Sequence, residues 1–139
     1  MDEMEFCNLG NGGKETRFVR YLPHPSIFEG AAAGAVLLGT VPQARAFREQ
    51  FDWPDAVVDI PTGDRGVEQL FAQLDADPKR VHAIRAANVR HSLRRHDWCH
   101  RWRTILETIG MEPRPALSSR VESLNRAAAA FDPQPGGCV

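Results

Sequence analysis

The stretch that decides the fold is residues 25–38, PSIFEGAAAGAVLL, in which a polar helix start runs through small residues into an apolar strand. Ser26 is a good N-cap residue, and Glu29 follows three positions later, as in a capping box. Between Glu29 and Gly34 no residue is bulkier than alanine, so we expect the helix to lie close against a sheet. Helix N-termini and the carboxyl ends of parallel strands favour anions. The stretch therefore predicts a site for a phosphorylated ligand, with Glu29 at its edge.

The composition is that of one globular domain. The chain has 139 residues, of which 42% are hydrophobic and 25% charged, and a domain commonly has roughly 100 to 200 residues. No apolar run approaches the roughly 18 residues of a membrane span, and the start, MDEME, is acidic where a signal peptide is basic. We therefore expect a cytoplasmic protein. Cys7, Cys99 and Cys138 lie far apart and are interpreted as free thiols.

Charge is distributed unevenly along the chain. Residues 1–78 carry 6 Lys or Arg against 13 Asp or Glu, whereas residues 79–103 carry 8 Lys or Arg against Asp97 alone. A basic segment of this kind can dock on a nucleic acid or another anionic partner. We favour the simpler interpretation that the two portions offset each other within one domain, because the pI of the whole chain is about 6.5. We expect no nucleic-acid partner.

The spacing of apolar residues predicts alternating strands and helices. Strands are expected at residues 17–21, 36–38 and 56–60. After the opening helix, further helices are expected from Pro42 to Trp53, after a cap at Asp64, from Pro78 to about Arg95, after a cap at Asp97, and from about Ala116 to Phe131. In the helix after Asp64, the apolar face comprises Val67, Leu70, Phe71 and Leu74. In the helix after Asp97, Trp98 and Trp102 are expected to be core anchors.

This order predicts an α/β fold with a parallel sheet flanked by helices and extra helices at the C-terminal end. Three strands are few for a doubly wound sheet, so we expect a partial Rossmann-like sheet that is one part of a larger fold. The predicted organisation is an irregular segment at residues 1–16, a domain at 17–131, and a flexible tail at 132–139 that contains two prolines and two glycines.

Several sequence blocks match those of a known family. Residues 28–38, FEGAAAGAVLL, are similar to the pattern F-E-x-x-A-x-G-A-x-L-L, and residues 55–60, DAVVDI, form a matching strand. Asp77 and Pro78 precede the long helix, and residues 96–102, HDWCHRW, form the late block. On these blocks, their order and their spacing, residues 17–131 resemble the C-terminal part of group 1 glycosyltransferases. The similarity is to the branch with a spore-maturation glycosyltransferase-like C-terminal domain.

The resemblance implies a GT-B architecture, in which two Rossmann-like domains hold a UDP- or GDP-sugar mainly through the second domain, with no metal or other cofactor. The second Glu of the family's Glu-x7-Glu motif, which contacts the nucleotide ribose, corresponds to Glu29. The first corresponds to Tyr21, so half of the motif is absent. A carboxylate that accepts hydrogen bonds from two vicinal hydroxyls gains roughly 1.5 to 3 kcal/mol for each bond.

Other nucleotide contacts are implied around Glu29. The resemblance gives diphosphate contacts to the backbone N–H groups of Ser26, Ile27 and Phe28, and charge neutralisation to Arg17 or Arg20. It identifies no catalytic residue.

Simpler interpretations remain open for these residues. The spacing of Ser26 and Glu29 matches a capping box, which contributes roughly 1 kcal/mol of helix stability without any ligand. Arg17 and Arg20 are equally compatible with exposed charges on a strand or loop.

The pair His96 and His100, with Asp97 after the first, is similar to the H-E-x-x-H motif of zinc peptidases. If Asp97 is an N-cap, His96 lies outside the helix and the two imidazoles do not share a face. Asp is also a shorter base than the Glu that this chemistry uses. We therefore do not predict a zinc site.

The leading functional hypothesis is hexosyl transfer from a nucleotide sugar to an unknown acceptor. An enzyme of the GT-B type also needs an acceptor domain, which 139 residues cannot contain beside this half. We therefore expect a C-terminal fragment that binds the nucleotide sugar and is inactive in isolation. The alternative is a non-catalytic α/β interaction module that uses the basic segment at residues 79–103.

Overall fold

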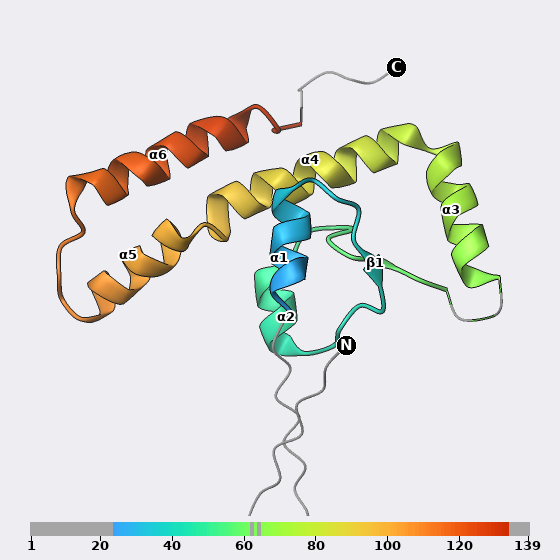
Figure 1. Cartoon of the computed structure of the whole chain (residues 1–139), viewed down its shortest axis with the longest axis horizontal. Coiled ribbons are helices and arrows are strands. Elements are labelled where there is room, and N and C mark those ends of the chain that lie inside the picture. Colours follow the sequence, from blue (N-terminus) through green and yellow to red (C-terminus); the bar gives the residue numbers. More distant parts are fainter. Residues whose placement is uncertain (1–23, 62, 64, 134–139) are drawn as a thin grey trace, which may run out of the picture.

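The computed structural model describes residues 24–61, 63 and 65–133. Within them lie the helices α1 (Pro25–Ala32), α2 (Arg45–Gln50), α3 (Gly66–Ala76), α4 (Pro78–Arg95), α5 (Trp98–Thr108) and α6 (Pro115–Ala129), and the strands β1 (Leu38–Gly39) and β2 (Val58–Asp59). Figure 1 shows this arrangement. The predicted strand at 17–21 and most of the predicted tail lie outside the described residues.

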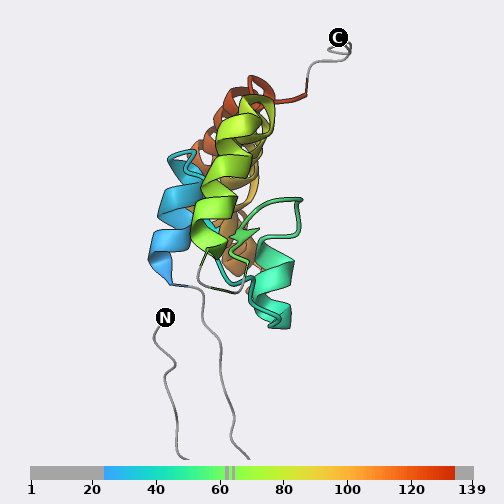
Figure 2. The ribbon, with the colours of Figure 1, turned by 90° about the vertical axis from the view of Figure 1, so that its right-hand side faces the viewer.

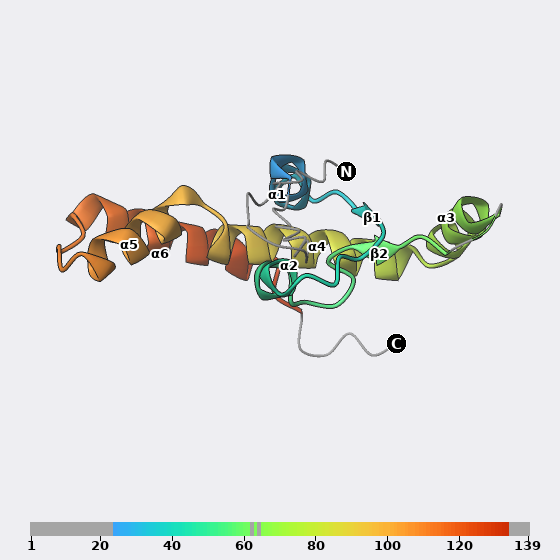
Figure 3. The same ribbon diagram turned by 90° about the horizontal axis from the view of Figure 1, so that it is seen from below.

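Helix α4 is the spine of the molecule. Helices α1, α3 and α6 pack against it, and α5 packs against α6. Figure 1 shows α3 at one end of α4 and the α5–α6 pair at the other, which gives an elongated shape. Figures 2 and 3 place α1 and α2 on opposite sides of α4. No helix of the described segments is long and apolar enough to cross a membrane.

Strands β1 and β2 form a small parallel sheet. Leu38 pairs with Val58 and Gly39 with Asp59, and the Val58 N–H donates to the Leu37 carbonyl at 2.8 Å. The fold is thus a mostly helical α/β arrangement, and the predicted parallel pairing is confirmed. The predicted strands were too long: of residues 36–38 only Leu38 lies in the ladder, which continues to Gly39, and of residues 56–60 only Val58 and Asp59 do.

The close approach expected for the small-residue helix is confirmed. A Cβ atom on Gly30 would lie 2.8 Å from Cδ2 of Leu37. Gly34, which follows the C-cap Ala33 of α1, has a left-handed φ of 69°. The N–H groups of Gly34 and Ala35 donate back to the carbonyls of Ala31 and Gly30 at 3.0 and 2.9 Å, as in a Schellman motif. This stop turns the chain directly from α1 toward β1.

Three apolar clusters make up the described core. The first joins α1 to α2 and the following loop and contains Ala31, Phe47, Phe51, Trp53 and Ala56. The second joins β2, α3 and α4 and contains Val58, Leu70, Leu74 and Ile84. The third joins α5 and α6 and contains Cys99, Val121 and Leu124. Within the predicted apolar face of α3, Leu70 and Leu74 are buried, whereas Val67 and Phe71 are about half exposed.

A buried polar bridge joins the first cluster to α4. The Asn88 side chain is fully buried; its Oδ1 accepts a hydrogen bond from Trp53 Nε1 at 2.8 Å, and its Nδ2 donates to the Ala35 carbonyl at 2.8 Å. The Arg85 Nε donates to the Gly34 carbonyl at 3.0 Å. These bonds hold the segments that follow α1 and α2 against the spine.

Two of the predicted helix caps are confirmed. Asp77 Oδ1 accepts from the Arg80 N–H at 2.9 Å at the start of α4, and Asp97 Oδ1 accepts from the Cys99 N–H at 2.9 Å at the start of α5. In contrast, the prediction that Ser26 caps α1 was wrong, because the N-cap is His24. The predicted cap at Asp64 lies outside the described residues.

The expectation that Trp98 and Trp102 anchor the core was wrong. Their side chains are 70% and 54% exposed. The face of α5 that packs on α6 is instead the face of Cys99, which lies in a cluster with Val121 and Leu124. Trp98 lies about 100° from Cys99 around a helix of 3.6 residues per turn, and Trp102 lies about 60° from it, so neither side chain is centred on that contact.

Candidate functional site

The candidate site lies where α1 begins and the two strands end. Figure 1 shows β1 running back toward the end of the molecule at which α1 begins. Because β2 is parallel to β1, the carboxyl ends of both strands face the same edge. This is the edge at which open α/β sheets bind ligands.

The first turn of α1 is capped by its own flanking residue. The Ser26 N–H donates to Nδ1 of His24 at 3.3 Å, and the Ser26 hydroxyl lies 2.8 Å from the same nitrogen. The Ile27 N–H donates to the His24 carbonyl at 3.0 Å. Two of the three N–H groups predicted to contact a diphosphate, those of Ser26 and Ile27, therefore have intramolecular partners. A diphosphate would have to displace His24 to reach them.

Glu29 does not act as a capping-box residue. The Ser26 N–H that such a box would direct to Glu29 is directed to His24 instead. The Glu29 side chain is exposed, and it makes no hydrogen bond or ion pair within the part of the chain that the structure describes. The capping-box interpretation is thus wrong, and the carboxylate is available to a ligand.

Phe28, the third predicted contact residue, has its ring in an aromatic cluster. The ring centre lies 5.1 Å from that of Phe51 and 5.0 Å from that of His96. His96 in turn lies 5.2 Å from Phe51. The cluster ties α1 to the end of α2 and to the junction between α4 and α5. The side chain of Phe28 thus helps to hold α1 in position. This packing role does not depend on the predicted contact of its backbone N–H group with a diphosphate.

The His96 imidazole is held neutral by its surroundings. Burial among these rings, with Arg95 and Arg101 nearby, lowers the pKa of His96 to about 4, and the backbone of Gln50 opposes the shift only in part. A neutral ring packs well against aromatic neighbours, whereas a charged ring loses its hydration there. His96 is therefore a structural residue at ordinary pH.

Arg101 is a neighbour of α1 that sequence reasoning missed. Its guanidinium carbon lies 5.6 Å from the centre of the Phe28 ring and 5.5 Å from that of Trp98. No local pattern indicated this contact, because it joins two helices separated by most of the chain. The two arginines predicted at the site, Arg17 and Arg20, lie outside the described residues.

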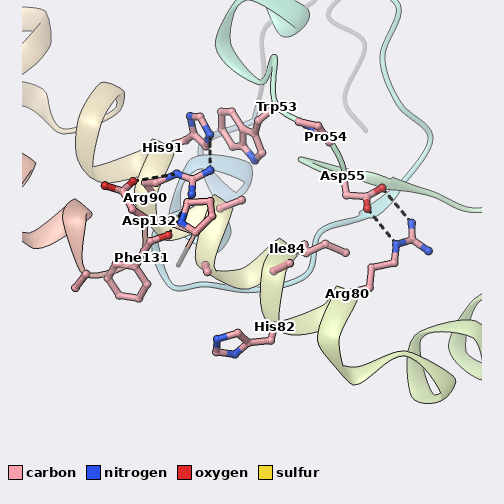
Figure 4. Close-up of a pocket in the computed structure, with 15 residues that line it drawn as sticks. Trp53, Pro54, Asp55, Arg80, His82, Ile84, Arg90, His91, Phe131 and Asp132 are labelled. Carbon is pink, nitrogen blue, oxygen red and sulfur yellow. Dashed lines mark hydrogen bonds and ion pairs between the residues drawn. The ribbon is translucent and has the colours of Figure 1, made fainter. Parts of the chain in front are cut away.

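A separate groove of about 540 Å³ lies on α4 and does not include Glu29 among its lining residues. Figure 4 shows Asp55 and Arg80 facing each other at one end, and Arg90, His91 and Asp132 at the other. Nε and Nη2 of Arg80 each donate to an Asp55 carboxylate oxygen at 3.0 Å. Arg90 donates to the Phe131 carbonyl at 3.1 Å. The charged groups of the groove are thus satisfied by one another.

The basic segment at residues 79–103 is largely neutralised within the molecule. Arg80 pairs with Asp55, Arg94 with Asp132 at 2.9 Å, and Arg95 with Asp52. The guanidinium of Arg95 lowers the pKa of Asp52. Asp52 and Asp55 belong to the acidic portion, so the predicted offsetting is seen for Arg80 and Arg95, whereas the partner of Arg94 lies near the C-terminal end. These pairs weaken the alternative of an interaction module built on this segment.

The two histidines of the zinc-like pattern have different surroundings. His96 lies outside α5, as the cap at Asp97 predicts, and its ring is in the aromatic cluster. Nε2 of His100 lies 2.9 Å from the Leu93 carbonyl. Among residues 24–61, 63 and 65–133, no group of three or more His, Cys, Asp or Glu side chains has an arrangement that could hold a metal ion.

A match to a family model places the chain in a known class. Residues 8–107 match the family model described as glycosyl transferase-like. The match covers more than half of the chain, including α1 to α4 and most of α5, so this protein belongs to the glycosyl transferase-like family. No curated protein and no solved structure is significantly similar to the chain.

Proposed function

We propose that this chain binds a UDP- or GDP-sugar at the start of α1 and takes part in the transfer of its hexosyl group to an acceptor. Membership of the glycosyl transferase-like family supports glycosyl transfer in general, which implies a sugar donor and an acceptor. The observation that carries the proposal to a particular site is the free carboxylate of Glu29, on the helix that leads into the parallel sheet.

In the proposed complex, Glu29 accepts hydrogen bonds from the two ribose hydroxyls of the nucleotide. The carboxylate is exposed and unpaired within the described residues, so binding breaks no internal bond of this side chain. Two charge-assisted hydrogen bonds of roughly 1.5 to 3 kcal/mol each would favour a nucleoside over a free phosphate at this place. The diphosphate lies toward the first turn, at the N–H groups of Ser26, Ile27 and Phe28.

The His24 cap occupies one of the N–H groups that a diphosphate would contact. Its Nδ1 accepts from the Ser26 N–H in the free protein. We infer that the diphosphate replaces this contact and that Arg17 or Arg20 balances its charge as the leaving group departs. The cost of losing one exposed cap is small, about 0.5 to 2 kcal/mol.

We further propose a GT-B architecture of the spore-maturation type, in which residues 17–131 form the nucleotide-binding half. The helix-before-strand order and the parallel pairing of β1 with β2 support this assignment. An acceptor domain, which this hypothesis places outside residues 17–131, would bind the acceptor and provide the catalytic base. The cytoplasm is the proposed compartment.

Titration calorimetry with UDP and with GDP tests the nucleotide site. We expect one of the two to bind, and Glu29→Gln to weaken it roughly tenfold to a hundredfold because hydrogen bonds to a charged acceptor are lost. Glu68→Gln is the matched control, since Glu68 is an exposed carboxylate in the first turn of α3. Equal affinities of the Glu29→Gln and Glu68→Gln variants would contradict the proposal.

A further inference from the structure

Arg101 differs from the other arginines near the centre of the molecule in how its charge is satisfied. Arg80, Arg94 and Arg95 each pair with an aspartate. Arg101 has no acidic partner within the described residues, and its guanidinium lies over two aromatic rings. It is thus a fixed positive charge whose N–H groups are not used by a carboxylate.

The two rings hold the guanidinium in place. Its carbon lies over the Phe28 ring at 5.6 Å and over the Trp98 ring at 5.5 Å. A cation held over ring faces keeps the N–H groups at its edge free to donate. We define this arrangement of Phe28, Arg101 and Trp98 as the arginine clamp. The clamp limits the motion of a long side chain before any ligand arrives.

The clamp lies beside the first turns of α1. Helical side chains tilt toward the N-terminus, so the ring of Phe28 covers the turn that precedes its own Cα. Arg101 lies over that ring, and Phe28 stands in the first turn of α1 together with Ser26 and Ile27. Glu29, with its free carboxylate, follows Phe28 directly in the helix. One negative and one positive side chain, both unpaired, thus border the same end of α1.

We propose that Arg101 binds the phosphoryl groups of the nucleotide sugar, with Phe28 and Trp98 as positioning residues. This inference rests on the proposed nucleotide site and adds to it a cation from α5, a helix that the sequence did not connect with α1. The planar guanidinium donates two parallel hydrogen bonds to phosphate oxygens. Trp98 is 70% exposed, and its ring contacts the Arg101 guanidinium.

Calorimetry with a nucleoside diphosphate, its nucleoside and inorganic pyrophosphate separates phosphate contacts from ribose contacts. Here and below, UDP and uridine are named for the case that UDP is the nucleotide that binds, and GDP and guanosine replace them if GDP binds instead. For Arg101→Gln we expect roughly tenfold or weaker binding of UDP and pyrophosphate, with uridine unchanged. Arg101→Lys restores only part of the affinity, because lysine lacks the planar fork. Trp98→Leu lowers the affinity for UDP by a smaller factor than Arg101→Gln does, because it leaves the guanidinium less constrained without removing its charge.

Arg103→Gln is the matched control. Arg103 lies two residues farther along α5 and pairs with Glu107 at 3.8 Å, so its loss is not expected to change UDP affinity. Thermal melting of each variant verifies that the fold is kept, as expected for an exposed position.

The outcomes distinguish this inference from the proposed function. If UDP binds and Glu29→Gln weakens it while Arg101→Gln does not, the inference is overturned and the nucleotide site stands. If neither UDP nor GDP binds but pyrophosphate binds in an Arg101-dependent way, the nucleotide site fails and the arginine clamp stands as an anion site. If neither ligand binds the native chain, both are overturned.

Discussion

The start of α1 and the groove on α4 differ in how their charges are satisfied. In the groove, Arg80 and Asp55 face each other, and Asp132 pairs with Arg94. At α1, Glu29 and Arg101 have no charged partner among the described residues. Paired charges mainly hold a structure together, whereas unpaired charges at one place are available to a ligand. On this ground we propose the start of α1, and not the groove on α4, as the ligand site.

The difference predicts that changes around the α4 spine alter stability, whereas changes at Glu29 alter binding. Asn88→Ala is expected to have the largest effect. It leaves the indole N–H of Trp53 without its partner in a buried place, where an unpaired polar group costs about 1 to 3 kcal/mol, and it removes the part-buried bond to the Ala35 carbonyl. We expect the free energy of unfolding in urea to fall by about 2 to 4 kcal/mol.

Gln73→Ala on the exposed face of α3 is the control for this change. Surface substitutions of this kind usually alter stability by less than about 0.5 kcal/mol. A loss for Asn88→Ala that is no larger than that of Gln73→Ala would show that the buried bridge does not hold the spine.

The second prediction concerns pH. The pKa of His96 is about 4 in the folded chain against an ordinary value of 6.5, so the unfolded chain binds its proton first as the pH falls. The free energy of unfolding should therefore decrease from about pH 6.5 to about pH 4 and be fully retained above this window. Burial and the Arg90 charge also lower the pKa of His91, which acts in the same direction.

Equilibrium unfolding between pH 4 and 7.5 measures this dependence. His96→Phe, which keeps an aromatic ring beside Phe28 and Phe51, should flatten the slope. His82→Phe, at an exposed position of α4, should leave it unchanged. If the free energy of unfolding of the native chain and of His96→Phe changed with pH in parallel, His96 would be ruled out as the source of the pH dependence.

A smaller loss is expected from Asp97→Ala. Although burial opposes it, the Cys99 N–H and Arg120 lower the pKa of Asp97 to about 2. The substitution removes the cap of α5, which is worth about 1 kcal/mol, and the contact with Arg120 at 2.9 Å. Thermal unfolding would detect the loss, with Asp75→Ala on α3 as the control. No difference between the two variants would mean that the cap contributes nothing.

The smallest effect on stability is expected for Glu29→Gln. The side chain has no partner to lose within the described residues, so the free energy of unfolding should change by less than about 0.5 kcal/mol. Urea denaturation measures it. A loss above about 1 kcal/mol would indicate a structural role and undo the contrast between the two regions.

Local patterns predicted much of this fold. Aspartate caps before Pro78 and Trp98 gave the starts of α4 and α5, because capping depends on a few adjacent residues. The small residues around Gly30 predicted the close approach of α1 to the strand segment. The parallel pairing followed from the order of strands and helices.

Contacts between distant segments were not predictable in the same way. His24 displaced Ser26 as the cap of α1, because its Nδ1 reaches the N–H that a serine would otherwise serve. Trp98 was expected in the core because it is large and apolar, yet α6 covers the neighbouring face of α5 at Cys99. The contact of Arg101 with Phe28 depends on tertiary packing and left no signal in either helix.

Amide chemical shifts recorded during a titration with UDP test the central claim most directly. The account predicts that the largest shifts occur at α1, around Glu29, and at Arg101 on α5, and that they disappear in Glu29→Gln at the same UDP concentration. The amide chemical shifts of residues that line the groove between Asp55 and Asp132 should not change. Shifts concentrated in that groove, or no shifts at all, would contradict it.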